Sequence, residues 1–170
     1  GMWAFAIHGP IKNRVFLSRD RFGVKPLYYY SDGTDFFFAS EIKQLLPFRP
    51  KGYNKEILLN YLVYGLEEYS QDSFFAGIVK LLPAHNLLID LTNGTVSTSV
   101  YYELKYNANY AALKETEAIE LFQKEFERSI RYRLRSDVQV GTCLSGGLDS
   151  SAIAAVASKQ FKPKNKGQRF

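Results

Sequence analysis

The chain has 170 residues, which is enough for one domain or for two small ones. Hydrophobic residues make up 46% and charged residues 23%, as in ordinary soluble globular proteins, and the net charge of +5 fits nucleotide handling and a solvated basic face equally well. No apolar run approaches ~20 residues and no signal peptide is visible, so we expect no membrane span, and a cytoplasmic location follows as the default. The single cysteine, Cys143, excludes an internal disulfide and a cysteine-based zinc site, and its place in a predicted strand favours a buried core residue.

Three hairpins are predicted in the first 104 residues, where apolar strands alternate with turns rich in Gly, Asn and Asp. The strand pairs are Trp3–Ile7 with Val15–Ser18, Leu27–Ser31 with Phe36–Ala39, and Asn86–Leu91 with Thr95–Tyr101. A charged segment, Arg19 to Pro26, follows the first hairpin. Composition alone explains this segment as a salt-bridged turn at the edge of a sheet.

Helices are predicted where capping residues precede apolar residues at helical spacing. They run from Glu41 to Leu46 after Ser40, from Asn54 to about Tyr64 before Gly65, and from Thr116 to about Arg135. The polar, Asn-rich stretch 105–114 suits a linker between two domains. Glutamates are interspersed among the arginines of the last helix, which favours a solvated face over a surface for nucleic acid.

The stretch from Leu144 to Ser151 carries the strongest chemical signal. It follows an apolar run, Val138 to Leu144, and precedes Ala152–Ala157, which is dense in helix formers. This pattern predicts a strand, a tight glycine turn and a helix. The first amides of a helix have no internal partner, and adjacent glycines let the backbone approach a ligand, so the turn is predicted to bind phosphate.

Two common phosphate loops do not fit. A Walker A loop needs a lysine after its last glycine, and a dinucleotide fingerprint needs G-x-G-x-x-G. The S-G-G-L-D-S sequence instead resembles the motif of the ATP pyrophosphatase, or PP-loop, family. The resemblance implies that ATP and its pyrophosphate are held by Leu144, Ser145, Gly146, Gly147, Asp149, Ser150 and Ser151. It also implies that Asp149 lies near a Mg²⁺ ion, a cation that prefers carboxylate and phosphate oxygens.

A second resemblance joins the two halves of the chain. Arg19–Tyr28, followed by Phe38–Glu41, resembles the latter part of a class II glutamine amidotransferase domain. Arg133–Gly141, running into Leu144–Ser151, resembles the start of a synthetase domain, and this order is similar to that of glutamine-hydrolysing asparagine synthetases.

The resemblance implies an α/β chain in three parts. Residues 1–104 would be the C-terminal part of an α+β, N-terminal-nucleophile amidotransferase domain. Residues 105–114 would be a linker. Residues 115–170 would supply the first strand, loop and helix of a doubly wound PP-loop domain.

The same resemblance implies a reaction. The parent enzyme would hydrolyse glutamine, adenylate aspartate with ATP, and let the ammonia attack aspartyl-AMP to give asparagine. Asp20 would contact the α-amino group of glutamine, a charge-matched pairing. The expected partners are glutamine, aspartate and ATP rather than nucleic acid or a membrane, and a homodimeric parent stays open.

One departure from the family bears on what the chain does alone. The family's glutaminase nucleophile is an N-terminal cysteine, whereas residue 1 is Gly and Cys143 lies in the second half. We therefore expect no catalytic residue within this chain, a nucleophile upstream of it, and no activity from the segment by itself. Ammonia release from glutamine by the isolated chain would contradict this expectation.

Three alternatives remain. Other PP-loop enzymes, which modify tRNA or form NAD, are disfavoured because they do not carry the Arg19–Tyr28 segment ahead of the loop. An amidotransferase related to asparagine synthetase could act on a carboxylate other than aspartate, since the residues that would choose the acceptor are absent. A non-catalytic nucleotide-binding or scaffold role is the third.

Overall fold

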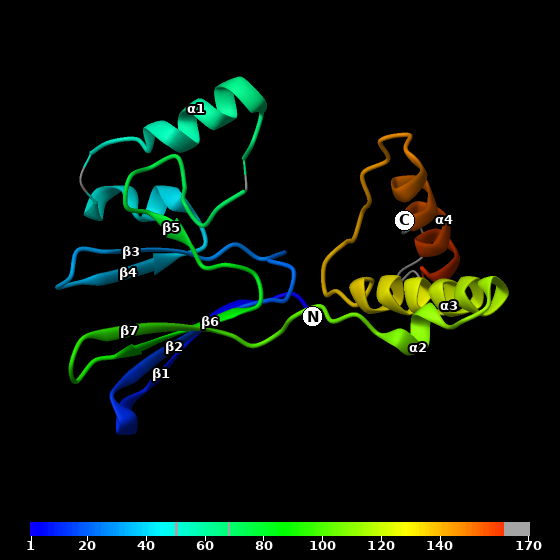
Figure 1. Ribbon diagram of the computed structural model, residues 1–170, viewed down its shortest axis with the longest axis horizontal. Coiled ribbons are helices and arrows are strands. Elements are labelled where there is room, and N and C mark those ends of the chain that lie inside the picture. Colours follow the sequence, from blue (N-terminus) through cyan, green and yellow to red (C-terminus); the bar gives the residue numbers. More distant parts are fainter. Residues whose placement is uncertain (50, 68, 162–170) are drawn as a thin grey trace. The chain divides into compact units, whose positions relative to one another are not determined.

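The computed structural model describes residues 1–49, 51–67 and 69–161, and the chain divides into a first unit, residues 1–105, and a second unit, residues 106–170. The first unit holds seven described strands and one α-helix (Figure 1). They are β1 (Ala4–Gly9), β2 (Arg14–Arg19), β3 (Tyr28–Ser31), β4 (Phe36–Ala39), α1 (Lys55–Tyr64), β5 (Val79–Lys80), β6 (His85–Asp90) and β7 (Thr95–Val100). The described part of the second unit holds α2 (Ala108–Ala111), α3 (Glu115–Arg133) and α4 (Leu148–Gln160). This mixture confirms the α/β class.

The strands of the first unit form two antiparallel sheets. One has the order β1-β2-β6-β7 and the other the order β4-β3-β5. All three predicted hairpins are present, because each turn contains residues that reverse the chain at low cost. In the first turn Asn13 takes the left-handed conformation with φ of 49°, which asparagine tolerates better than most residues.

The core of the first unit lies between the two sheets. Leu17 of β2 is paired with Leu87 of β6, and neither side chain is exposed. Tyr29 and Phe36 pack against this cluster from the second sheet. A second cluster on the far side of that sheet contains Tyr30, Leu45 and Ile78. Alternation of inward and outward side chains along each strand therefore gives the second sheet two packed faces.

Helix α1 has the boundaries that its sequence predicts. The Asn54 side chain accepts a hydrogen bond from the N–H of Ile57 at 3.3 Å, and Gly65 ends the helix in the left-handed region with φ of 68°. The predicted helix over 41–46 is instead two 3₁₀ turns, Ile42–Gln44 and Leu46–Phe48. Glu41 rather than Ser40 begins the first of these turns, with its N–H donating to the side chain of Gln44.

The second unit is built on the contact between α3 and α4. Ile130 and Ala157 are buried, and the Gln160 side chain donates to the backbone oxygen of Glu127 at 3.1 Å. Helix α3 begins one residue before the predicted Thr116, and the Glu117 carboxylate accepts from the N–H of Lys114. None of the helices in the part of the chain that the structure describes has the length and apolarity needed to cross a membrane.

The predicted strand over 138–144 is absent from the structure, in which these residues have irregular backbone. A strand is defined by a ladder of hydrogen bonds to a neighbour, and the described residues of the second unit contain no other strand to pair with. The glycine turn and the helix after it are both present. Cys143 is consequently exposed, which corrects the prediction that it is buried.

Candidate functional site

The loop from Leu144 to Ser151 forms a turn directly before α4. Gly146 has a φ of +84°, in the region that glycine adopts without strain, and Gly147 is the extended residue that precedes the helix. A Cβ at Gly146 would meet no atom within 4 Å, so the space over the turn is open. The residues of the loop are exposed apart from Ser150, which is half-buried.

Three hydroxyl groups converge at this turn. The Oγ atoms of Ser145 and Ser150 are 3.1 Å apart. The hydroxyls of Ser150 and Ser151 both donate to the backbone oxygen of Gly147, at 3.1 and 2.8 Å. The structure therefore brings together the three serines that the motif singles out.

Backbone donors are also available at this end of α4. The first hydrogen bond of the helix runs from the N–H of Ser151 to Gly147, which has no side chain to cap the preceding amides. The N–H groups of Leu148, Asp149 and Ser150 come before that bond and cannot be satisfied within the helix. The positive end of the helix dipole adds to their attraction for an anion.

Asp149 is the one carboxylate in the first turn of α4, and it is exposed. Among the residues that the structure describes, no group of three or more His, Cys, Asp and Glu side chains could hold a metal ion. Magnesium usually takes one or two protein carboxylates and completes its shell with phosphate and water oxygens. Asp149 is thus the residue that would hold a Mg²⁺ ion here, and a bound phosphate would supply further oxygen ligands.

Asp20 lies in the other predicted site, and only 1% of it is exposed. Its Oδ1 accepts hydrogen bonds from the N–H groups of Phe22 and Val24, at 3.2 and 3.0 Å. Its Oδ2 accepts from those of Trp3 and Lys25, at 3.3 and 2.9 Å. Burial raises the pKa of Asp20, but these four N–H groups lower it, and the pKa lies below the ordinary aspartate value of 3.8.

Arg19, the residue before Asp20, also holds the loop of residues 20–25 in place. Its guanidinium donates to the backbone oxygens of Lys25, Leu81 and Gly23, at 2.8, 2.7 and 2.8 Å. Composition predicts a turn held by salt bridges between side chains, and this prediction is wrong, because Arg19 and Asp20 bind backbone groups instead. Arg19 and Asp20 both bind main-chain groups, and together they hold residues 20–25 in one conformation. The sequence analysis did not assign Arg19 this role in holding the loop. The signal that could have indicated it is the position of Arg19 beside Asp20 and four residues before Gly23.

These contacts bear on the expected role of Asp20. A carboxylate offers about four lone-pair positions, and four N–H groups already use them. The geometry therefore gives Asp20 a structural role in shaping the loop, and its contact with the α-amino group of glutamine stays a prediction.

Comparison with known families assigns both parts of the chain. Residues 1–102 match the family described as glutamine amidotransferase domain, and residues 121–168 match the family described as asparagine synthase. The first match covers more than half of the chain.

Named relatives agree with these matches. A candidate glutamine-hydrolysing asparagine synthetase 2 of Methanocaldococcus jannaschii is 40% identical over 175 residues, covering 100% of this chain and 33% of that protein. Glutamine-hydrolysing asparagine synthetase 2 of Bacillus subtilis is 38% identical, covering 94% of this chain and 23% of its own length. Amidase chry2 of Gibberella zeae is 32% identical, covering 98% of this chain and 24% of its own length.

The chain spans a third or less of the length of these relatives. The two matches begin in the first unit and continue through the Leu144–Ser151 loop. The chain belongs to the glutamine amidotransferase domain family, which its residues 1–102 match, and its residues 121–168 are similar to the asparagine synthase family.

Proposed function

We propose that the chain is part of a glutamine- and ATP-dependent enzyme that converts aspartate to asparagine through aspartyl-AMP. Its own contribution to that reaction is the binding of the ATP phosphates at Leu144–Ser151. The observation that carries this proposal is the exposed glycine turn at the start of α4, with three serine hydroxyls and three uncapped amides around it. The boundaries 1–104, 105–114 and 115–170 for the two domain segments and their linker belong to the same proposal.

Each residue of the loop has a distinct part. The amides of Leu148, Asp149 and Ser150 donate to the oxygens of the pyrophosphate group. The hydroxyls of Ser145, Ser150 and Ser151 add donors once they rotate away from their present acceptors. Gly146 and Gly147 keep side chains out of the phosphate position, and Asp149 would hold Mg²⁺. Fixed donors around the leaving pyrophosphate stabilise its charge, while ATP supplies the adenylyl group.

Replacing Gly147 by valine should weaken the binding of Mg·ATP by at least about tenfold, because the branched side chain occupies the space of a phosphate oxygen. The residue has a φ of −77°, and a Cβ there meets its nearest neighbour, the Ser145 hydroxyl, at an ordinary 3.6 Å. The fold should therefore tolerate the change. Isothermal titration of the whole chain with Mg·ATP measures the affinity.

Gly141→Val is the matched control. Gly141 precedes the same loop, and a Cβ there meets no atom within 4 Å. Unchanged affinity in Gly147→Val, or an equal loss in both variants, contradicts the loop assignment. A well-folded chain that does not bind Mg·ATP at all favours the scaffold alternative.

Replacing Asp149 by asparagine should reduce ATP affinity in the presence of Mg²⁺ and leave it nearly unchanged in EDTA, since only the metal contact is removed. The same titration, performed with and without Mg²⁺, checks this expectation. An equal loss under both conditions would assign Asp149 to the loop structure instead of to the metal.

A second candidate function differs in the substrate that receives the ammonia. The relatives include Amidase chry2 and Amidase chyE, which are 32% and 30% identical to this chain and carry no asparagine synthetase name. A carboxylate other than aspartate is therefore the alternative substrate of the parent enzyme. Pyrophosphate release by the complete enzyme, measured with aspartate and with other carboxylic acids, decides between them.

A further inference from the structure

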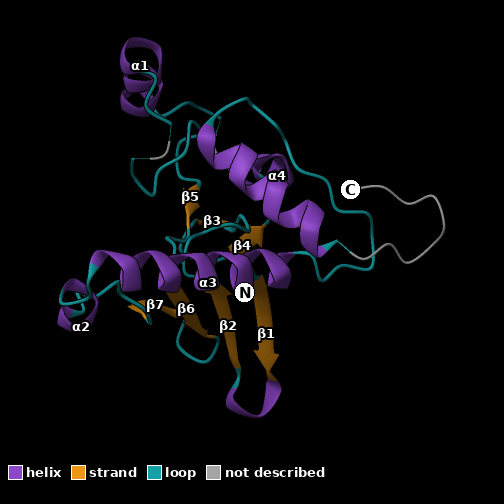
Figure 2. Cartoon of the chain, turned by 90° about the vertical axis from the view of Figure 1, so that its right-hand side faces the viewer, coloured by secondary structure: helices purple, strands orange, loops and turns teal. Residues whose placement is uncertain are grey.

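Tyr101 is the first residue after β7, and its side chain reaches the end of β2. Its hydroxyl donates to the backbone oxygen of Arg19 at 2.7 Å, although the two residues are 82 positions apart in the sequence. Its backbone N–H donates to the oxygen of Ala84 at 3.0 Å, which continues the β6–β7 pairing by one bond. Figure 2 shows β2, β6 and β7 side by side, with β6 in the middle. Tyr101 therefore spans the end of β6 and fastens the end of β7 to the residue before Asp20.

The peptide group between Arg19 and Asp20 is held on both sides. Its oxygen accepts from the Tyr101 hydroxyl, and its N–H donates to the oxygen of Trp3 at 2.9 Å. A peptide group is planar, so bonds to its oxygen and to its nitrogen together fix its orientation. The Cα of Asp20 belongs to this plane. The direction in which the Asp20 carboxylate enters the loop of residues 20–25 therefore depends on the Tyr101 hydroxyl.

Ala84 connects Asp20 to Tyr101 a second time. Its N–H donates to the backbone oxygen of Asp20 at 3.0 Å, and its own oxygen accepts from the N–H of Tyr101. Ala84 is 6% exposed and has a φ of +60°, in the left-handed region that alanine rarely adopts. Such a conformation persists only where the surrounding structure determines it. Asp20, Ala84 and Tyr101 are therefore fixed against one another.

The Tyr101 ring is also held by a contact that does not involve its hydroxyl. It stacks on the Trp3 ring, with the two centroids 6.1 Å apart. Burial raises the pKa of Tyr101, the Arg21 guanidinium lowers it and the Asp20 carboxylate raises it, and the pKa lies above the ordinary tyrosine value of 10.0. The hydroxyl therefore keeps its proton near neutral pH and remains a donor.

We propose that Tyr101 is a positioning residue for glutamine in the amidotransferase reaction, and that it acts through the Arg19–Asp20 peptide group on the loop of residues 20–25. The inference rests on the proposed function and on the predicted contact between Asp20 and the α-amino group of glutamine. The Asp20 carboxylate accepts from four N–H groups, three of which belong to the loop itself. A shift of the peptide group therefore moves the carboxylate and the loop together, and with them the surface that the loop offers to glutamine.

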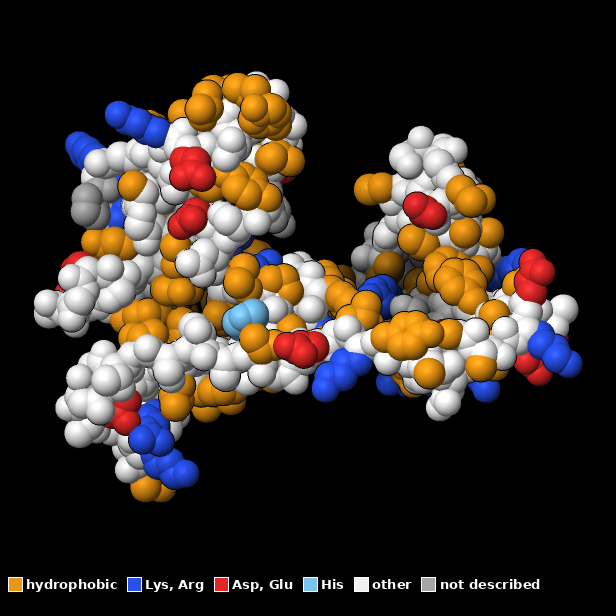
Figure 3. All heavy atoms as spheres, in the orientation of Figure 1, with side chains coloured by type: hydrophobic (Ala, Val, Ile, Leu, Met, Phe, Trp, Pro, Cys, Tyr) orange, Lys and Arg blue, Asp and Glu red, His pale blue; other side chains and the backbone are white. Residues whose placement is uncertain are grey.

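Tyr101→Phe tests the contact in the whole chain, because it removes one hydroxyl and keeps the ring on Trp3. We expect the N–H groups of Val24 and Lys25, which donate to Asp20, to exchange with deuterium at least about tenfold faster, since the loop loses an anchoring hydrogen bond. The amides of α1 are the internal reference and should exchange as before. This helix has its own hydrogen bonds, and hydrophobic side chains gather over it on the surface of the first unit (Figure 3).

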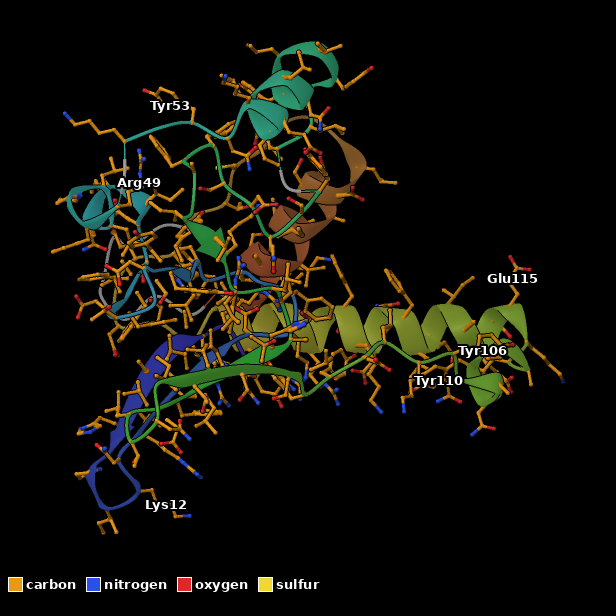
Figure 4. The ribbon with its side chains drawn as sticks, turned by 60° about the vertical axis from the view of Figure 1, so that its left-hand side comes forward. Lys12, Arg49, Tyr53, Tyr106, Tyr110 and Glu115 are labelled. Carbon is orange, nitrogen blue, oxygen red and sulfur yellow. The ribbon has the colours of Figure 1, made fainter. Side chains whose placement is uncertain are left out.

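Tyr106→Phe is the matched control, because it also removes one tyrosine hydroxyl. Tyr106 is 83% exposed and lies on the segment between β7 and α2 (Figure 4). This variant should leave hydrogen exchange in the loop of residues 20–25 unchanged. If the loop exchanges at the same rate in Tyr101→Phe and in Tyr106→Phe, the Tyr101 hydroxyl does not hold the loop and the proposal is wrong.

In the complete enzyme, Tyr101→Phe should raise the KM for glutamine at least about tenfold. Asparagine formation from added ammonia should be unchanged, because free ammonia supplies the nucleophile without glutamine. A variant that had only lost stability would lose both activities. An unchanged KM for glutamine, or equal losses with glutamine and with ammonia, would overturn the positioning role. If the unchanged enzyme does not hydrolyse glutamine, the proposed function itself fails, and this inference fails with it.

Discussion

Replacing Asp20 by asparagine should lower the free energy of unfolding of the first unit by about 3 kcal/mol, because N–H groups that donate to this buried carboxylate would lose their acceptor. An amide keeps one acceptor oxygen, and its NH₂ group would face two of the four N–H donors of the loop. Trp3, the only tryptophan, reports on this unit because it donates to the Ser18 hydroxyl at 3.1 Å and stacks on Tyr101. Urea denaturation followed by its fluorescence measures the change.

The effect should also depend on pH. The pKa of Asp20 is lowered by folding, so its carboxylate contributes stability above the ordinary aspartate value of 3.8, and this contribution is lost as the pH falls through the folded pKa. The difference in stability between the unchanged chain and Asp20→Asn should be constant near neutrality and should narrow below about pH 4. Asp35→Asn, on an exposed turn of the same unit, is the control. If the difference in stability between the unchanged chain and Asp20→Asn does not become smaller in acid, Asp20 stabilises the fold by its shape and not by its charge.

Local signals in the sequence predicted much of the fold. The β6–β7 hairpin follows from Asn93-Gly94, and α1 follows from Asn54 at one end and Gly65 at the other. In each case the residues that decide the conformation are neighbours in the chain, so their preferences act whatever the rest of the molecule does. The same reasoning located the turn before α4, since Gly146 adopts a conformation with positive φ that only glycine adopts freely.

The predictions that were wrong concern structures whose partners lie far away in the sequence. The apolar run 138–144 has strand propensity, but strand structure needs a neighbouring strand. The charges of the segment from Arg19 to Pro26 suggested a salt-bridged turn. The partners of Arg19 and Asp20 are instead backbone groups, and one of them, the oxygen of Leu81, is 62 residues from Arg19. No pattern within the segment Arg19–Pro26 contains that information. The turn before α4 was predictable because the residues that form it are consecutive in the sequence, whereas its binding of phosphate stays a prediction.

Gly23→Ala should destabilise the first unit by about 3 kcal/mol, combining backbone strain with a steric clash. Gly23 has a φ of +66°, where alanine is strained by about 1–2 kcal/mol. A Cβ at this position would also lie 2.8 Å from Cγ of Pro83 and 3.0 Å from Nη2 of Arg19. The guanidinium that holds the loop would have to move, and its hydrogen bond to the oxygen of Gly23 would be strained or broken.

Gly94→Ala separates the two contributions. Gly94 has a similar φ of +72°, but a Cβ there meets no atom within 4 Å, so this variant carries the backbone strain alone. We expect Gly23→Ala to lose more stability than Gly94→Ala by about 1–2 kcal/mol in urea denaturation. If both variants lose the same stability, Arg19 and Pro83 move away from the added methyl group without cost. Asp20 then shapes the loop without the support of Arg19. A double variant with Arg19→Lys tests this directly, because the clash disappears if the guanidinium causes it.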